Sequence, residues 1–164
     1  MSTGAYVLVK FDDRNKLLPA VESIGGIKQI QSWDAVDGHF NLVLKLNSND
    51  PEAIEQIRKL DGCTRLSLCE FKSDANGETE LAPELSYSYV FIETERFQQQ
   101  TVQSLLEKNE AVQKCTPVTG ACDLVALVKG ETFDKIDRIV NHGIRPLDGI
   151  LRLKQDRIIF LDRM

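Results

Sequence analysis

The sequence predicts an α+β protein in which two tandem ferredoxin-like βαββαβ units pack sheet to sheet as an intramolecular pseudo-dimer, similar to a dimeric α/β barrel. Three observations predict this fold. The chain repeats itself, both copies show the same order of predicted strands and helices, and the expected central strands are apolar at successive positions. The length of 164 residues, with 42% hydrophobic and 27% charged residues, is typical of a globular protein.

Three pairs of matching segments carry the repeat, which a sequence must be searched for early because it decides the architecture. The pairs are residues 6–9 with 89–92, residues 36–43 with 118–125 (V-x-G-x-x-[N/D]-L-V), and residues 60–66 with 147–153 (L-D-G-x-x-R-L). We therefore predict a first repeat at residues 1–72 and a second at residues 87–164. The polar segment 73–86, which contains Gly77 and Pro83, is predicted to be a linker.

In the first repeat, an apolar β run is followed by a helix that a Gly-Gly pair closes. A strand and its return strand flank Asp37-Gly38, which is typical of a two-residue hairpin turn. A second helix is expected to begin at an Asp50 N-cap with Pro51 in its first position, before the last strand. The predicted strands are residues 6–11, 28–36, 40–46 and 63–71, and the first helix is residues 16–24.

The second repeat follows the same order. Its first helix has an apolar stripe of Val102, Leu105 and Leu106, and Gly143 is expected to end its second helix. The predicted strands are residues 87–93, 112–118, 122–129 and 150–160, and the predicted helices are residues 97–108 and 132–141.

The third strand of each repeat is apolar on both faces. Residues 42–44 (LVL) and 124–128 (LVALV) lack the alternation of a sheet with one solvated side. Helices are expected to cover one face of each sheet, so a second sheet must cover the other. The sister repeat is the obvious second sheet, which is why a pseudo-dimer is predicted.

Charge and hydropathy exclude several classes of function. The net charge is -5 and the isoelectric point is near 5.1, so the basic excess that direct nucleic-acid binding rewards is missing. The longest apolar run, residues 124–128, is far shorter than the roughly 18 residues of a membrane span. The N-terminus lacks the basic start and apolar stretch of a secretory signal. We expect a soluble cytoplasmic protein without membrane contact.

The four cysteines predict thiols rather than a metal centre. Cys63, Cys69, Cys115 and Cys122 form no C-x-x-C pair, and the chain holds two histidines. Cys115 and Cys122 could face each other across a hairpin, but a disulfide is not expected in a cytosolic protein. The sequence also lacks the nucleophile-elbow, zincin, P-loop and dinucleotide motifs. We therefore expect no metal, no cofactor and no catalytic residue.

Residues 118–124 (VTGACDL) resemble the T-G-x-x-D stretch of the effector-binding domain of Lrp/AsnC transcription regulators, also called the RAM domain. The resemblance covers both repeats, because residues 36–42 (VDGHFNL) share the pattern. In that family the domain dimerises sheet to sheet, and small effectors, often amino acids, bind near this hairpin. The resemblance implies that ligand-binding residues lie at both hairpins: Gly38, His39, Asn41, Gly120, Ala121 and Asp123.

The chemistry of these residue types fits such a site. Glycine lets a ligand approach backbone N–H groups, and the carboxylate of Asp123 can pair with an ammonium group. Asn41 offers no charge, so the two copies are not expected to be equivalent. The plain alternative is that both glycines serve only the backbone of the hairpin and that Asp123 caps the turn.

The resemblance implies a non-enzymatic module for small-molecule binding and oligomerisation, with an amino acid as one candidate effector. The first strand begins near residue 5, which leaves no room for the family's helix-turn-helix, so direct operator binding is not expected. Self-association, or co-assembly with Lrp/AsnC-like regulators in transcription regulation, is the implied partnership.

The alternative is a small enzyme or a haem- or tetrapyrrole-handling protein of the dimeric α+β barrel type. Relatives of Lrp/AsnC proteins act as decarboxylases in haem biosynthesis. In that case haem ligation would fall on His39 or His142.

Overall fold

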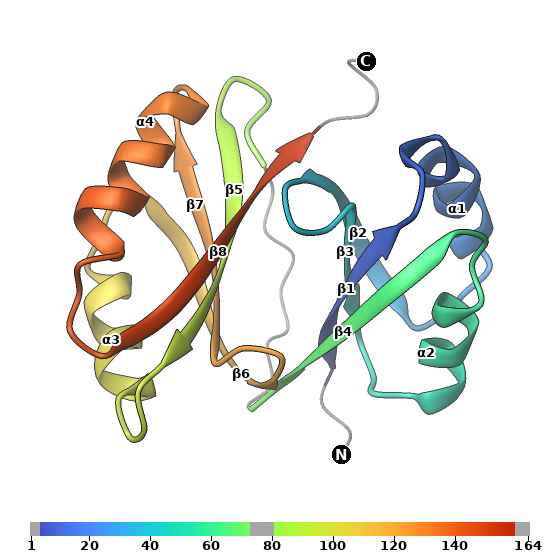
Figure 1. Ribbon diagram of the computed structural model, residues 1–164, viewed down its shortest axis with the longest axis horizontal. Helices are drawn as coiled ribbons and strands as arrows, with labels where there is room; N and C mark the ends of the chain where they lie inside the picture. Colours follow the sequence, from blue (N-terminus) through green and yellow to red (C-terminus); the bar gives the residue numbers. More distant parts are fainter. Residues whose placement is uncertain (1–3, 73–80, 160–164) are drawn as a thin grey trace.

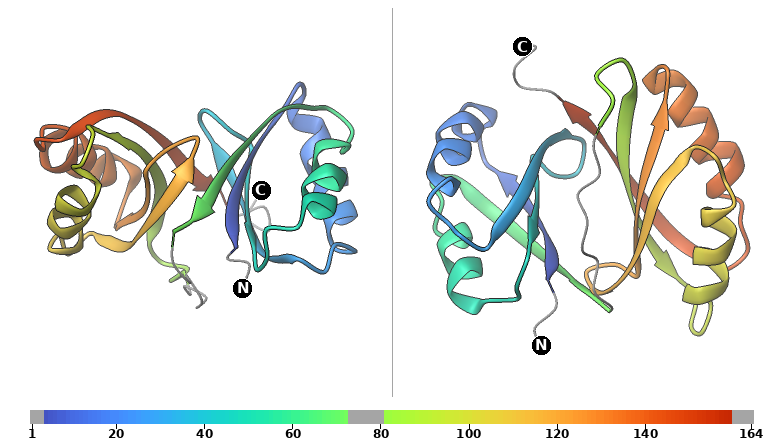
Figure 2. Two further views of the ribbon diagram at one scale, coloured as in Figure 1. Left: turned by 90° about the horizontal axis from the view of Figure 1, so that it is seen from below. Right: turned by 180° about the vertical axis from the view of Figure 1, so that it is seen from behind.

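The computed structural model describes residues 4–72 and 81–159 and shows two similar halves side by side (Figure 1). Each half has a four-stranded sheet with two helices on its outer side, so the sheets face each other across the middle of the molecule (Figures 1 and 2). The first repeat contains β1 (Ala5–Phe11), the 3-10 turn η1 (Arg14–Lys16), α1 (Leu17–Ile24), β2 (Ile30–Asp37), β3 (Leu42–Leu46), α2 (Pro51–Arg58) and β4 (Cys63–Phe71). The second contains β5 (Ser86–Thr94), α3 (Gln99–Glu107), β6 (Val112–Gly120), β7 (Leu124–Gly130), α4 (Phe133–Arg138), the π-helical turn η2 (Ile139–Ile144) and β8 (Ile150–Ile159).

The eight strands close into one antiparallel barrel in the order β1-β3-β2-β8-β5-β7-β6-β4. Two seams join the repeats, because β2 pairs with β8 and β4 pairs with β6. The predicted α+β pseudo-dimer of ferredoxin-like units is therefore confirmed. The sheets also join along their edges, which hides edge strands that would otherwise be exposed.

Three apolar clusters explain why the central strands are apolar on both faces. One cluster fills the barrel between the two sheets and is rich in aromatic rings, among them Tyr6, Phe40, Tyr89 and Phe91. The other two lie between each sheet and its own helices. Strand β3 is buried along its whole length, since it contributes to both layers.

Local signals explain the helix boundaries. The Asp50 side chain accepts a hydrogen bond from the Glu52 N–H at 3.0 Å, and Pro51 occupies the first turn of α2, as predicted. The first helix of the chain begins later than residue 16, after η1, whose N-cap is Asp13. Helix α4 gives way to η2, a wider turn that absorbs the longer connection of the second repeat.

The hairpin at Asp37-Gly38 is not a two-residue turn. Strand β2 ends at Asp37 and β3 begins at Leu42, so residues 38–41 form a longer loop. The backbone N–H groups of His39 and Phe40 bond to Asp156 of the other repeat, which holds the loop open across the seam.

Other expectations concern the linker, the membrane and the thiols. Residues 73–80 of the predicted linker lie outside the described residues, and β5 begins at Ser86. No helix within residues 4–72 and 81–159 is long and apolar enough to cross a membrane. All four thiols are free, and Cys122 contacts Cys69 rather than Cys115.

Candidate active site between the repeats

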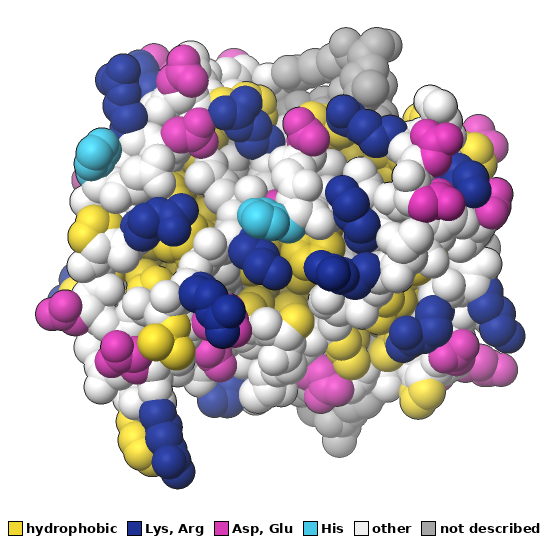
Figure 3. Space-filling view, in the orientation of Figure 1, with side chains coloured by type: hydrophobic (Ala, Val, Ile, Leu, Met, Phe, Trp, Pro, Cys, Tyr) yellow, Lys and Arg dark blue, Asp and Glu magenta, His cyan; other side chains and the backbone are white. Residues whose placement is uncertain are grey.

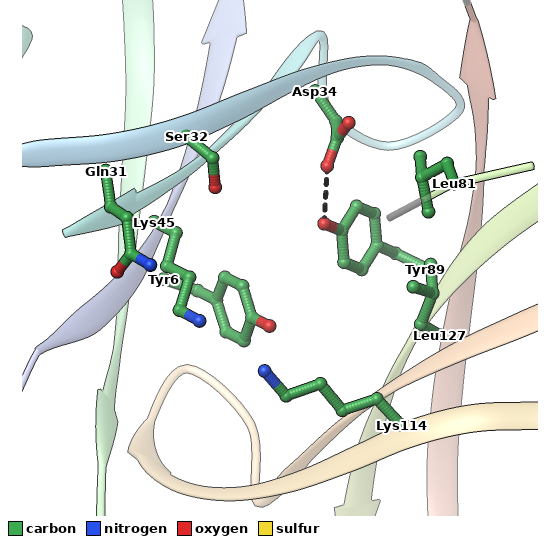
Figure 4. A pocket seen from close by; sticks show the side chains of 9 residues that line it. All are labelled: Tyr6, Gln31, Ser32, Asp34, Lys45, Leu81, Tyr89, Lys114 and Leu127. Atoms are coloured by element: carbon green, nitrogen blue, oxygen red, sulfur yellow. Dashed lines mark hydrogen bonds between the residues drawn. The ribbon is translucent and has the colours of Figure 1, made fainter. Parts of the chain in front are cut away.

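A cavity of about 330 Å³ opens between the two sheets and is lined by both repeats. Figure 4 shows polar side chains from β1, β2, β3, β5 and β6 converging on it. A mixed polar and apolar cavity of this size is what small-molecule sites share. The lining residues are Tyr6, Gln31, Ser32, Asp34, Lys45, Leu81, Tyr89, Lys114 and Leu127.

Two tyrosines occupy matching positions in the two repeats, and the hydroxyl group of each contacts a side chain of the opposite repeat. Tyr89 in β5 donates its hydroxyl hydrogen to Asp34 Oδ2 in β2, with 2.6 Å between the oxygens. Tyr6 in β1 is hydrogen-bonded to the Thr116 side chain in β6. The two tyrosine rings lie edge to face, with their centroids 6.0 Å apart. Both rings line the cavity, one from each repeat.

Burial sets the protonation of this group. Burial raises the pKa of Asp34, and the hydrogen bond from Tyr89 opposes that shift. Burial, followed by the negative charge of Asp34, holds the pKa of Tyr89 well above its usual value. Burial likewise raises the pKa of Tyr6 to about 12, although its bond with Thr116 acts the other way. Both phenols therefore stay protonated at neutral pH, beside a carboxyl group that binds protons more readily than usual.

Two lysines bring positive charge to the same space. The Lys45 side chain points from β3 into the barrel and is 6% exposed, although its neighbours in the strand are all apolar. Lys114 reaches in from β6, and Figure 4 shows both ammonium groups near the Tyr6 ring. Burial of a lysine ammonium group costs desolvation free energy, whereas burial of the apolar side chains beside it in β3 does not. The described residues that line the cavity thus include two ammonium groups and the carboxyl group of Asp34.

The charged residues mark where the two repeats differ. Strand registers place Asp34 where the second repeat has Thr116, and Lys45 where it has Leu127. Lys114 likewise stands where the first repeat has Ser32. The cavity therefore combines a symmetric tyrosine pair with charged residues that each have an uncharged counterpart in the other repeat.

Sequence reasoning missed this set, although a signal for it was present. Lys45 interrupts the run Leu42-Val43-Leu44-Lys45-Leu46, and charge inside a strand that is buried on both faces indicates a polar cavity. Asp34 and Lys114 gave no such signal, because charged residues are equally common at exposed strand positions that have no functional role.

The six predicted ligand residues lie at the two seams, in two separate groups. Asn41 Oδ1 accepts a hydrogen bond from the Phe11 N–H, and Asp123 Oδ2 accepts one from the Thr94 N–H, each at 2.8 Å. These bonds tie the hairpin to the end of the first strand in each repeat. None of the six lines the cavity between the sheets.

The two hairpin glycines face the opposite repeat closely. A Cβ atom at Gly38 would lie 2.5 Å from Asp156 Oδ1, and one at Gly120 would lie 2.3 Å from the Leu68 carbonyl oxygen. His39 and Ala121 follow these glycines and are exposed. Ligand binding at these hairpins stays a prediction.

The chain's own donors do not favour a histidine-bound metal or haem in the cavity. Neither His39 nor His142 lines it, and the described residues contain no cluster of three or more His, Cys, Asp or Glu side chains suited to a metal ion. The polar groups that the described residues bring to the cavity are phenols, ammonium groups, one carboxyl group, the Gln31 amide and the Ser32 hydroxyl group.

Solved structures share this fold along nearly the whole chain. A siroheme decarboxylase, NirDL, in complex with an iron-uroporphyrin III analogue matches 96% of this chain and 71% of its own, with TM-score 0.76 and 11% identity. A protein of Fusobacterium nucleatum described as a monooxygenase matches 94% of this chain and 89% of its own, with TM-score 0.54 and 11% identity. The sequence matches no protein-family model and no curated protein.

Lrp/AsnC proteins match only part of the chain. AsnC of E. coli aligns with 66% of this chain and 69% of its own at 12% identity, and its TM-score of 0.45 is too low to show the family. Lrp/AsnC proteins are thus among the structural neighbours, while membership and effector binding stay predictions.

One expectation is corrected by these comparisons. The prediction that the chain is not an enzyme is wrong, because solved structures that match nearly all of it are named as enzymes. That prediction depended on the resemblance to the RAM domain and on the lack of known catalytic motifs in the sequence. At about one-tenth identity the matches show the fold, so any reaction must be argued from the cavity itself.

Proposed function

We propose that this protein is an enzyme of the dimeric α+β barrel type, whose active site is the cavity between the two repeats. Its substrate is a small molecule that carries a carboxylate, and its chemistry is proton transfer. The observation that carries the proposal is the convergence of Lys45, Lys114, Tyr6 and the Tyr89–Asp34 pair on one enclosed space.

The lysines supply substrate binding. An ammonium group within a largely apolar barrel favours an anion, because charge-assisted hydrogen bonds strengthen where water is scarce. The cavity volume of about 330 Å³ sets the scale of the substrate at a small molecule.

The Tyr89–Asp34 pair supplies acid–base chemistry. A carboxyl group with a raised pKa, hydrogen-bonded to a phenol, can take a proton from a substrate and return one through the phenol. Tyr6 and Thr116 hold the matching place without a carboxylate, so they orient substrate and do not act as base. Proton transfer is therefore assigned to one side of the pseudo-symmetric site.

The match to NirDL supports a second candidate, in which a tetrapyrrole carboxylate is the substrate group. Loss of carbon dioxide from a bound carboxylate leaves a carbanion that a nearby acid must protonate, and Tyr89 or Tyr6 is placed for this step. In this case the tetrapyrrole is substrate, and its iron finds no histidine at the cavity. Titration with an iron porphyrin separates this candidate, because a shifted Soret band that requires Lys45 supports it.

The experiment compares wild type with Asp34→Asn in a bacterial metabolite extract analysed by mass spectrometry. We expect wild type to deplete at least one carboxylate-bearing metabolite and Asp34→Asn to slow that depletion by about 100-fold or more, the scale of general base catalysis. The Asn side chain still accepts the hydrogen bond from Tyr89, so the fold is retained. The matched control is Asp61→Asn, which should behave as wild type, because the Asp61 side chain is 90% exposed and lines none of the described cavities.

The proposal fails if no metabolite is consumed by wild type, or if Asp34→Asn and Asp61→Asn consume it equally fast.

A further inference from the structure

Two cysteines from different repeats meet inside the barrel. Cys69 lies in β4 and Cys122 in the loop between β6 and β7, and their Sγ atoms are 3.5 Å apart. Cys69 is fully buried and Cys122 is 5% exposed. A disulfide bond places its sulfur atoms about 2.05 Å apart, so an approach of roughly 1.5 Å would join them.

Comparison of the seams shows that Cys69 stands where the other repeat has the carboxylate of Asp156. Cys69 pairs with Tyr6 and Asp156 pairs with Tyr89, so the two residues hold matching places in the repeats. Asp156 accepts two backbone hydrogen bonds at 2.8 Å from the loop opposite. The Cys69 sulfur lies beside the corresponding N–H groups of Ala121 and Cys122, which lower its pKa, and the Ala121 N–H itself donates to the Leu68 carbonyl oxygen at 3.0 Å. One seam thus holds a carboxylate where the other holds a thiol.

The same donors favour a thiolate at Cys69. The hydrogen bond with the Cys122 thiol, together with the two backbone N–H groups, lowers the pKa of Cys69 although burial opposes this. The pKa of Cys122 is raised, chiefly by its hydrogen bond with the Cys69 sulfur and then by burial. When the pair loses one proton, a thiolate and a thiol are left in contact, which is the arrangement that an oxidisable pair needs.

A small cavity gives access to the Cys122 member of the pair. Cys122 lines a space of about 50 Å³ together with Ser67, Glu93 and Lys154. A space of this size holds more than one water molecule, so it admits a molecule of the size of hydrogen peroxide. The cavity borders β4 and β8, which face the viewer in Figure 1, and Figure 3 shows Lys and Arg side chains around hydrophobic ones at the middle of this face.

We propose that Cys69 and Cys122 form a modification site, a dithiol that hydrogen peroxide oxidises to a reversible disulfide between the two repeats. The thiolate of the pair attacks one peroxide oxygen, an S–O bond forms, the O–O bond breaks and hydroxide leaves. The second sulfur then attacks the resulting sulfenic acid and gives up its proton, so that an S–S bond forms and water leaves. The dithiol loses two electrons and peroxide gains them.

The first experiment uses the Cys63→Ser/Cys115→Ser protein, which keeps only the pair. It is treated with hydrogen peroxide, quenched with catalase, unfolded and exposed to N-ethylmaleimide, and its intact mass is measured. We expect the loss of two hydrogens, no maleimide adduct and full reversal by dithiothreitol. Adding Cys69→Ser should abolish the intramolecular disulfide. If both thiols take up maleimide after peroxide treatment, the proposal is overturned.

A second measurement on the unaltered protein guards against a variant that fails to fold. The rate of disulfide formation is followed in native buffer and in urea by non-reducing peptide mapping. The folded protein should form the Cys69–Cys122 bond at least ten times faster than the unfolded chain, because the fold holds the sulfurs in contact. Equal rates, or a bond that involves Cys63 or Cys115 instead, would overturn the proposal.

Discussion

The hydroxyl group of Tyr89 donates a hydrogen bond of 2.6 Å to Asp34 Oδ2, and this bond runs from one repeat to the other across the barrel. The matching tyrosine, Tyr6, meets Thr116 instead of a carboxylate. A duplicated fold has thus kept its aromatic pair and made the partners unequal. The proposed function uses this inequality, because the general base is Asp34 and the matching position in the other repeat, Thr116, cannot serve as a base.

Asp34 should make stability depend on pH in a direction that can be worked out. Burial raises its pKa above the usual 3.8, so its contribution to the free energy of unfolding is complete below pH 3.8 and is lost as pH rises through the raised pKa. Asp34→Asn does not titrate and still accepts the Tyr89 hydrogen bond. Urea unfolding of both proteins across this window should show the variant gaining stability relative to wild type as pH rises. A difference that stays constant with pH would contradict this assignment.

Lys45→Met should separate stability from binding. Methionine matches the length of the lysine and suits the apolar strand, so the free energy of unfolding should rise or change by less than about 1 kcal/mol. Carboxylate binding in the cavity should weaken at least tenfold in the same variant. Urea unfolding and a binding titration test the two halves of this prediction. A large loss of stability would mean that Lys45 serves mainly the fold.

Asp156→Ala should destabilise the seam between β2 and β8. The carboxylate accepts hydrogen bonds from the backbone N–H groups of His39 and Phe40, and truncation to alanine removes this acceptor from both. Loss of hydrogen bonds to a charged group predicts a cost of about 2–4 kcal/mol in the free energy of unfolding. Asp156→Asn keeps an acceptor and should cost less. Equal, small effects of both substitutions in urea unfolding would show that the loop does not depend on this carboxylate.

Gly120→Ala tests whether the hairpin glycine is required by close packing. Its φ angle of 123° is unfavourable for other residues, and a Cβ atom would lie 2.3 Å from the Leu68 carbonyl oxygen. We expect a loss of about 1–3 kcal/mol in thermal or urea unfolding. The matched control is Gly26→Ala, where nothing lies within 4 Å of the new atom and stability should hold or rise slightly. Similar effects at both glycines would contradict the packing argument.

Much of the fold could be predicted because the repeat and the apolar periodicity are properties of neighbouring residues. The Asp50-Pro51 helix start, the buried β3 and the two facing sheets all follow from local patterns. Closure of the barrel could not be predicted, since the pairing of β2 with β8 depends on edges more than one hundred residues apart. The Gly38 loop was mispredicted for the same reason, because its backbone donors bond to Asp156.

The candidate site was harder to predict than the fold. Only Lys45 carried a local signal, whereas Asp34 and Lys114 line a cavity only because the sheet of the other repeat lies opposite them. The hairpin hypothesis remains testable in its own right. Asp123→Asn keeps an acceptor for the Thr94 N–H but loses the charge, so an amino acid that raises the melting temperature of wild type alone would support an effector site there.

The central claim, that the inter-repeat cavity binds carboxylates through its lysines, is tested most directly by saturation-transfer NMR with benzoate, succinate and pyruvate as probes. Wild type should transfer saturation to at least one probe, and both Lys45→Met and Lys114→Met should abolish the transfer. Lys28→Met, which removes an exposed lysine outside the cavity, should leave it unchanged. Equal transfer in all four proteins, or none in wild type, would contradict the account.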